Sequence, residues 1–359
     1  MSFEETSFSS NPNFLYIDTI TDKSDCLSDS YNFDCFVNKT GETLLFYPYF
    51  DVKAQDHDYH IGIINLNEKG DNKEVGKLLG HKDRVICIRY FRDPFTNKDY
   101  LISSDKKYVV IVWDLDDNYK KIMEVETKYE GFIYSCYLIF EQNQKFAVTI
   151  SLGSNAVTKV YDVDHKDKVT EIAESKNLAV YYVDYWFNKN GNDGEKHIII
   201  QCGKNKVLMS AYPKNTTYLS IETTEKFPYI LNGLRFKNKD KDYFAFAATY
   251  GLIKIIEFET KQEVFKYEGP EKLNCHFNCF VKWNDRYLLL KDCAQRQIVV
   301  FDMDDGYKVK SKCLCPEDYF EKFMKKVKHP KYGESLLSLG IDWKIKLFSN
   351  RNIIPPKTN

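Results

Sequence analysis

The chain has 359 residues, and its 43% hydrophobic and 15% aromatic content supplies enough apolar side chain for a large core. Its 51 basic and 52 acidic residues give a net charge of −1, which excludes a general field that would attract nucleic acid or an anionic membrane. The first 13 residues do not resemble a secretory signal, and no run of about 18 apolar residues occurs. We therefore expect a cytoplasmic protein with no transmembrane segment and no nucleic-acid partner.

Ten cysteines raise the question of a metal site or a disulfide framework. Cys275 and Cys279 alternate with apolar residues, which places both thiols on one face of a strand. Cys313 and Cys315 are separated by one residue, and neither pair has a second pair at zinc-site spacing. We expect buried, reduced thiols in a reducing compartment, with no metal and no cofactor.

At the start of the chain, residues 1–13 are polar and are expected to be a disordered N-terminus. Residues 14–20 (FLYIDTI) form the first strand-like run, and no earlier segment can pair with it. Residues 21–34 contain four aspartates and are interpreted as a solvated acidic connection.

Residues 80–115 contain three strand-like runs between turn residues. A Gly-His pair opens the segment, Pro94 marks the first turn, and the third run ends on Trp113 and Asp114. Equivalent apolar residues end similar runs every 45 to 50 residues along the chain. These seven anchors are Ile64, Trp113, Tyr161, Ala211, Ile256, Phe301 and Phe348, and three of them are followed by aspartate, at Asp114, Asp162 and Asp302.

The unit at residues 80–115 resembles a WD40 repeat, whose hallmarks are a Gly-His opening and a Trp-Asp close. Residues 338–348 (SLGIDWKIKLF) are similar to the second half of the same repeat. The resemblance implies an all-β fold, a seven-bladed β-propeller over residues 14–350 with a C-terminal tail at 351–359. Because the last unit supplies only three strands, we expect the strand at about 14–20 to complete the last blade and close the ring.

In this family, a His, a Ser or Thr, an Asp and the Trp of one blade form a hydrogen-bonded tetrad. The equivalents here are His81, Ser103 and Trp113, but Asp105 lies eight residues before the tryptophan, whereas the family spacing is six. We therefore expect an incomplete tetrad in this blade. In the last unit, Asp342 has the six-residue spacing and is expected to occupy the place of the turn aspartate.

Residues 316–328 (PEDYFEKFMKKVK) fit two structures. Phe320, Phe323, Met324 and Val327 would share one face of a helix, with acidic residues first and lysines last. The repeat register instead requires the first strand of the seventh blade here. We favour the strand, because a missing strand would leave a blade edge unpaired, and a short helix before it would satisfy both patterns.

No Gly-rich phosphate loop, His-Glu-x-x-His motif, nucleophile elbow or kinase signature occurs, so we expect no catalytic activity. His57 and His60 are interpreted as a surface pair and not as metal ligands. The resemblance implies a protein–protein interaction scaffold, as a subunit or adaptor of a larger assembly. By analogy with the family, the candidate interaction face comprises His57, Lys82, Arg84, Lys106, Phe132, Tyr181, Tyr229 and Tyr250.

The alternative function is binding to phosphoinositides or another anionic membrane surface. Some related propellers bind such lipids through a Phe-Arg-Arg-Gly motif, and the nearest string here, at residues 234–237 (LRFK), lacks the paired arginines and the glycine. A basic cluster could attract an anionic lipid or an acidic partner. It consists of Lys322, Lys325, Lys326, Lys328 and Lys331.

Overall fold

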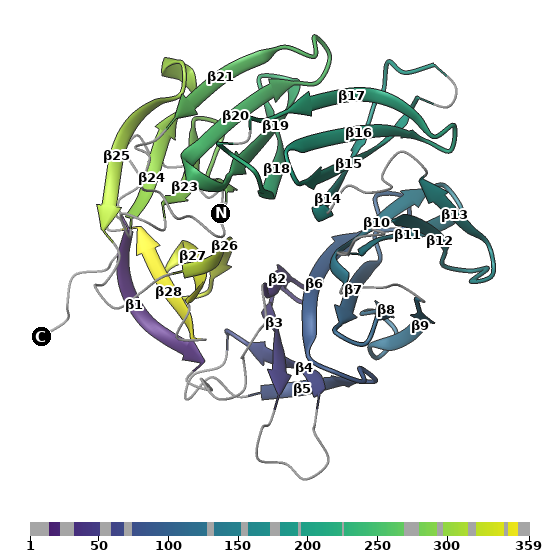
Figure 1. Ribbon diagram of the computed structural model, residues 1–359. Coiled ribbons are helices and arrows are strands. Elements are labelled where there is room, and N and C mark those ends of the chain that lie inside the picture. Colours follow the sequence, from purple (N-terminus) through teal and green to yellow (C-terminus); the bar gives the residue numbers. More distant parts are fainter. Residues whose placement is uncertain are drawn as a thin grey trace, which may run out of the picture.

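The computed structural model is a ring of seven four-stranded antiparallel sheets, the predicted seven-bladed β-propeller (Figure 1). The structure describes residues 14–21, 32–50, 59–67, 74–127, 133–151, 157–172, 180–192, 195–224, 226–268, 280–292, 297–314, 321–340 and 344–350. The predicted disordered N-terminus and C-terminal tail lie outside these ranges.

Blades 1 to 3 follow one another along the chain. Blade 1 contains β2 (Asp34–Val37), β3 (Thr43–Phe50), β4 (Tyr59–Asn65) and β5 (Glu74–Leu79). Blade 2 contains β6 (Val85–Arg92), β7 (Asp99–Asp105), β8 (Val109–Asp114) and β9 (Lys120–Glu126). Blade 3 contains β10 (Ile133–Glu141), β11 (Gln144–Ser151), β12 (Thr158–Asp162) and β13 (Val169–Ile172).

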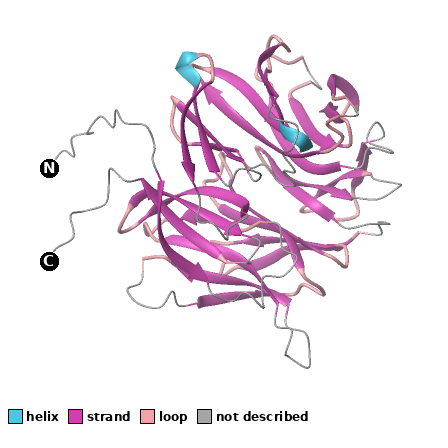
Figure 2. Ribbon diagram, turned by 60° about the vertical axis from the view of Figure 1, so that its left-hand side comes forward, coloured by secondary structure: helices cyan, strands magenta, loops and turns pink. Residues whose placement is uncertain are grey.

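Blades 4 to 6 repeat this order. Blade 4 contains β14 (Val180–Phe187), β15 (His197–Gly203), β16 (Lys206–Tyr212) and β17 (Thr216–Glu222). Blade 5 contains β18 (Ile230–Asn238), β19 (Lys241–Ala248), β20 (Leu252–Glu257) and β21 (Glu263–Glu268), with the 3-10 turn η2 (Thr249–Gly251). Blade 6 contains β22 (Phe280–Lys282), β23 (Tyr287–Asp292), β24 (Gln297–Asp302) and β25 (Lys308–Leu314), with η3 (Met303–Asp305). Figure 2 shows how strands dominate the described chain.

Blade 7 closes the ring as predicted. It contains β26 (Glu321–His329), β27 (Gly333–Gly340) and β28 (Ile345–Asn350), and its fourth strand is β1 (Phe14–Thr21). β1 is antiparallel to β28, with Phe14 opposite Asn350 and Thr21 opposite Ile345 (Figure 1). The strand prediction for the segment before residue 328 is therefore confirmed by β26, whereas the short helix proposed before it falls outside the described residues.

The hydrophobic cores lie between adjacent blades. One cluster joins Met123 of blade 2 to Leu138 of blade 3, and another joins Phe14 of β1 to Trp283 of blade 6, with their ring centroids 4.9 Å apart. A strand between two cores buries both faces, which explains the continuous apolar run in β8, whereas outer strands such as β9 alternate between buried and exposed residues. All seven predicted anchors lie in third strands and are buried.

The tetrad of blade 2 is complete, so the expectation that it would be broken is wrong. Ser103 Oγ lies 2.9 Å from Trp113 Nε1 and 2.7 Å from His81 Nε2, and His81 Nδ1 lies 3.2 Å from Asp105 Oδ2. Ser103 and Asp105 are two residues apart on β7 and share a face. The two residues by which the Asp105–Trp113 spacing exceeds the family spacing lie in the turn between β7 and β8, where Tyr108 adopts a φ of 68°. Asp342 lies outside the described residues.

Two further sequence interpretations need correction. His60 is fully buried on β4, where its ring stacks on Tyr49 at 4.3 Å, so it is not part of a surface pair, and His57 lies outside the described residues. Asp34 is also buried, at the start of β2, and does not belong to a solvated connection. Both errors arose because polar residues at the ends of inner or middle strands are enclosed by neighbouring blades.

The described cysteines are buried, as predicted for small apolar side chains. They are Cys35, Cys87, Cys136, Cys202 and Cys313. Cys275, Cys279 and Cys315 lie outside the described residues, so their predicted arrangement is not seen.

Candidate functional site

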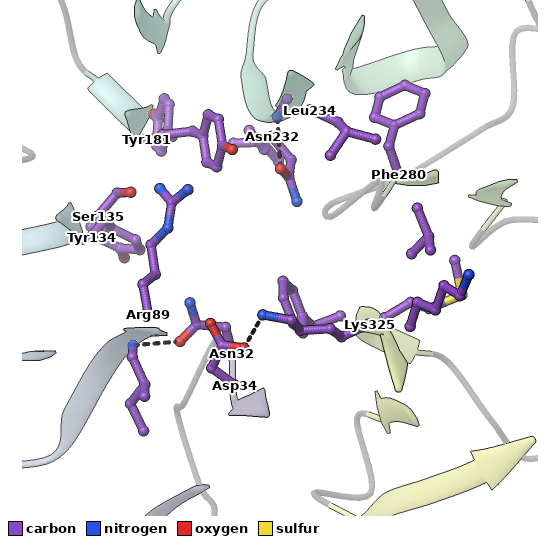
Figure 3. A pocket seen from close by; sticks show the side chains of 18 of the residues that line it. Asn32, Asp34, Arg89, Tyr134, Ser135, Tyr181, Asn232, Leu234, Phe280 and Lys325 are labelled. Carbon is purple, nitrogen blue, oxygen red and sulfur yellow. Dashed lines mark hydrogen bonds and ion pairs between the residues drawn. The ribbon is translucent and has the colours of Figure 1, made fainter. Parts of the chain in front are cut away.

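The central channel of the ring contains a cavity of about 370 Å³ to which all seven blades contribute residues. Its lining comes from the innermost strand of each blade or from the residues just before that strand, and mostly from the half near the strand's first residue. Since the innermost strands all begin at the same end of the ring, the cavity lies toward that end. In Figure 3, Arg89, Asn32 and Asp34 lie on one side of this cavity and Leu234 and Phe280 lie on the other.

Three tyrosines form a continuous row where blades 3, 4 and 5 meet the channel. The ring centroids of Tyr134 and Tyr181 are 6.3 Å apart, and those of Tyr181 and Tyr229 are 5.9 Å apart, both in edge-to-face geometry. Tyr134 and Tyr181 line the cavity, and Tyr229 is 38% exposed just before β18. Burial, and then the neighbouring tyrosines, raise the pKa of Tyr181 above its ordinary value, so its phenol remains a neutral donor.

Arg89 brings a positive charge into the channel from the middle of β6. Its Nη1 donates to the carbonyl oxygen of Val183 at 2.6 Å, which links blade 2 to blade 4. The guanidinium lies 4.6 Å from the ring centroid of Tyr137 and 5.3 Å from that of Tyr182. In Figure 3 its end points toward Tyr134 and Tyr181.

Lys325 and Asp34 form an ion pair across the channel wall, between β26 and β2. Burial lowers the pKa of the Lys325 ammonium to about 7, and the Asp34 carboxylate opposes that effect by favouring the charged form. Asn32 fixes the neighbouring backbone, because its Oδ1 accepts the Ile88 N–H at 2.8 Å. The ion pair therefore joins blade 7 to blade 1 at the cavity.

The opposite side of the cavity is mainly apolar, and Lys282 of blade 6 and Lys326 of blade 7 also line the cavity. Leu234 and Phe280 lie there in Figure 3. Met324 of β26 also lines the cavity. Asn232 lies between the two sides, and its Oδ1 accepts the Gly233 N–H at 2.6 Å, which leaves the amide nitrogen directed into the cavity. The cavity thus combines hydrogen-bond donors with an apolar wall, as small binding sites commonly do.

The structure brings together only part of the predicted interaction face. Tyr181 and Tyr229 are in contact, whereas Lys82 pairs with Glu126 at 2.7 Å on blade 2. Arg84 lies over the Phe50 ring at 4.5 Å. The backbone N–H of Lys106 donates to the Arg84 carbonyl at 3.1 Å. His57, Phe132 and the side chain of Tyr250 lie outside what the structure describes.

The predicted basic cluster does not form a single surface. Lys325 and Lys326 both line the channel cavity; Lys325 pairs with Asp34, and Lys326 pairs with Glu334 and lies 4.9 Å from the centroid of the Trp283 ring. Lys331 lies over the Tyr332 ring at 4.9 Å, Lys328 is exposed on β26, and the side chain of Lys322 is not described. The string at residues 234–237 runs along β18, where Phe236 is buried, and not through an exposed loop.

Sequence analysis missed Arg89, Asn232 and Tyr134. A signal for Arg89 was present, because it is the one charge inside the apolar run VICIRYF of an inner strand, and such a charge must face the channel or pair in a core. Tyr134 and Tyr181 both occupy the second position of a first strand, a correspondence that requires the strand boundaries. Asn232 carried no comparable signal.

Comparison with known proteins adds no family: no family model matches the chain, and no curated protein is significantly similar to it. Within the described ranges, no group of three or more His, Cys, Asp and Glu side chains is placed to hold a metal ion. In the same part of the chain, no helix has the length and apolarity needed to cross a membrane.

Proposed function

We propose that the chain is a WD40-like propeller that serves as a non-catalytic scaffold and binds protein partners at the end of the channel where the inner strands begin. Propeller folds are commonly protein-interaction scaffolds, and the seven blades here are joined by continuous cores. The observation that carries the proposal is the tyrosine row formed by Tyr134, Tyr181 and Tyr229.

Tyrosine is suited to this role because it buries a large ring and keeps a polar end for hydrogen bonding. The row borders a cavity, so a partner can pack against the rings and insert one side chain into the channel. The lipid-binding alternative requires a continuous basic surface, and it is weakened because Lys325 and Lys326 line the channel cavity and are each paired with a carboxylate, Asp34 and Glu334.

The test is affinity purification of the tagged protein from its native cells, with quantitative mass spectrometry of the bound proteins. The variant carries Tyr181→Ala and Tyr229→Ala. The matched control is Phe95→Ala, an aromatic residue that is 56% exposed in the β6–β7 turn. Because that turn follows a first strand, it lies at the opposite end of the ring from Tyr229.

We expect a stoichiometric partner set that is recovered with the wild type and the control and is lost from the tyrosine variant. Recovery of the same set with all three proteins would refute a binding role for the tyrosine row. Recovery of the bare chain in every case would refute a stable scaffold. Circular dichroism of each purified protein checks that the ring is folded.

A further inference from the structure

The channel has more hydrogen-bond donors than the described part of the chain satisfies. The Arg89 guanidinium carries five N–H donors. Within the described residues it makes one hydrogen bond, to the Val183 carbonyl. The Asn232 amide nitrogen also faces the cavity, because the side-chain oxygen is held by the Gly233 N–H.

The nearby carboxylates are already occupied. Asp34 accepts the N–H groups of Cys35 and Tyr90, at 2.6 Å and 2.8 Å, in addition to its ion pair with Lys325. Asp184 favours the charged form of Arg89, but one of its oxygens accepts the Tyr182 hydroxyl and the other accepts the Tyr185 N–H. Neither carboxylate therefore offers the paired acceptors that a guanidinium fork binds best.

A ligand for these free donors must be a negatively charged hydrogen-bond acceptor. It must fit a cavity of about 370 Å³ and must carry an apolar group that can contact the apolar wall. A carboxylate meets the first condition, since it accepts two parallel hydrogen bonds from an arginine. Leu234, Phe280 and Met324 supply the wall for an apolar neighbour of that carboxylate. The tyrosine row outside the cavity then contacts the flanking residues.

We propose that the channel binds an acidic residue of a partner protein, with its carboxylate held by Arg89 and Asn232 and an adjacent apolar residue against Leu234 and Phe280. This inference rests on the proposed scaffold function and specifies what the scaffold recognises. Arg89 is the main determinant, because it combines charge with two parallel donors. Asn232 adds a third donor from its place between the polar and apolar sides of the cavity.

The probe is a panel of fluorescein-labelled hexapeptides in which glutamate is followed by Leu, Ile, Phe or Tyr, read by fluorescence anisotropy. Each has a matched peptide with glutamine in place of glutamate. We expect at least one glutamate peptide to bind saturably and to bind about tenfold to a hundredfold more tightly than its glutamine partner. Arg89→Gln reduces the affinity by a similar factor, and Arg89→Lys, which keeps the charge but loses the fork, reduces it by less.

Two further variants separate a loss of peptide binding from a loss of folding. Asn232→Asp adds a carboxylate inside the channel while preserving the acceptor for the Gly233 N–H, so it abolishes peptide binding without lowering the melting temperature. Lys120→Gln removes the same charge as Arg89→Gln but lies on the outer strand β9, with its side chain 66% exposed, and leaves binding unchanged.

Equal binding of the glutamate and glutamine peptides, or equal binding by wild type and Arg89→Gln, would overturn the inference. Saturable binding of inorganic phosphate without any peptide binding would overturn the assignment to a partner carboxylate. Either result leaves the scaffold proposal standing if Tyr181→Ala with Tyr229→Ala still loses its partners. If the peptides show no Arg89-dependent binding and the tyrosine variant also keeps all its partners, the scaffold proposal fails as well.

Discussion

At the scale of single residues, the tetrad of blade 2 shows how a chain of buried hydrogen bonds selects the tautomer of its histidine. The Ser103 hydroxyl accepts the Trp113 indole N–H and has one proton left, which it donates to His81 Nε2. Full satisfaction then requires His81 Nδ1 to carry a proton and donate it to Asp105. The spacing of Asp105 from Ser103 decides whether the chain forms, and its spacing from the tryptophan does not.

Ser103→Ala therefore leaves two buried partners unsatisfied and should cost about 1–3 kcal/mol of unfolding free energy. Trp113→Phe removes one of the same bonds. Because both substitutions break one chain, their effects should not add in a double-mutant cycle measured by urea unfolding. Additive effects would show that the tetrad members act independently.

The aspartates that follow three of the anchors share one role: each ends a third strand and accepts N–H groups from the turn after it. Asp114 accepts those of Asp116 and Asp117, Asp162 those of Asp164 and His165, and Asp302 that of Asp304. Aspartate is favoured at such positions because its short side chain bonds the backbone two or three residues ahead.

Asp302 also predicts how stability depends on pH. Hydrogen bonds from Arg286 lower the pKa of Asp302 in the folded protein. Its contribution is therefore complete above the unfolded pKa of about 3.9 and is lost as pH falls through the folded value. We expect the melting-temperature difference between wild type and Arg286→Gln to shrink from pH 6 to pH 3.

The control for this measurement is Lys308→Gln, which removes an exposed ion pair with Asp305. Its melting-temperature difference from wild type should stay small across the same range, since exposed pairs contribute little. A constant difference for Arg286→Gln as well would contradict the assigned role of Asp302.

At the scale of elements, most strands could be predicted because alternation and turn residues are local signals. β26 was ambiguous because Phe323, Met324 and Val327 fit one helical face as well as a strand. The strand forms because β27, the next strand in the chain, pairs with it over its whole length, and this pairing outweighs the helical preference of the segment. Burial of His60 and Asp34 could not be predicted in the same way, since it depends on which blades enclose them.

Ring closure gives a prediction at this scale. Deleting residues 1–21 removes β1, exposes the edge of β28 and opens the core around Trp283, so the whole ring should melt at a lower temperature. Phe14→Ala alone should cost about 3–5 kcal/mol, because this ring is buried. Tyr16→Ala, on the same strand but 40% exposed, should cost much less.

Differential scanning calorimetry checks both effects. A single transition that moves down in temperature for the deletion and for Phe14→Ala supports closure by β1. An unchanged melting temperature after the deletion would eliminate the closure role, even though β1 pairs with β28 in the structure.

At the scale of the whole molecule, the number of blades could be predicted from a repeat of 45 to 50 residues. The residues of the channel site could not be predicted from that repeat. The residues that meet in the channel come from every blade, so Arg89 and Asn232 are 143 positions apart in the chain and line the same cavity only after closure. Tyr181 and Tyr229 were predicted from their place in the repeat, which is a local property. Lys325 was predicted as part of a surface cluster, but it lines the channel because β26 is the innermost strand of its blade.

The most direct measurement of the central claim is site-specific photo-crosslinking in the native cells. A benzoylphenylalanine is placed at position 229, beside the channel, or at position 95, at the opposite end of the ring. We predict a discrete crosslinked partner from position 229 that disappears when Arg89→Gln is added, and no such product from position 95. The same product from both positions, or none from position 229, would contradict partner binding at the channel.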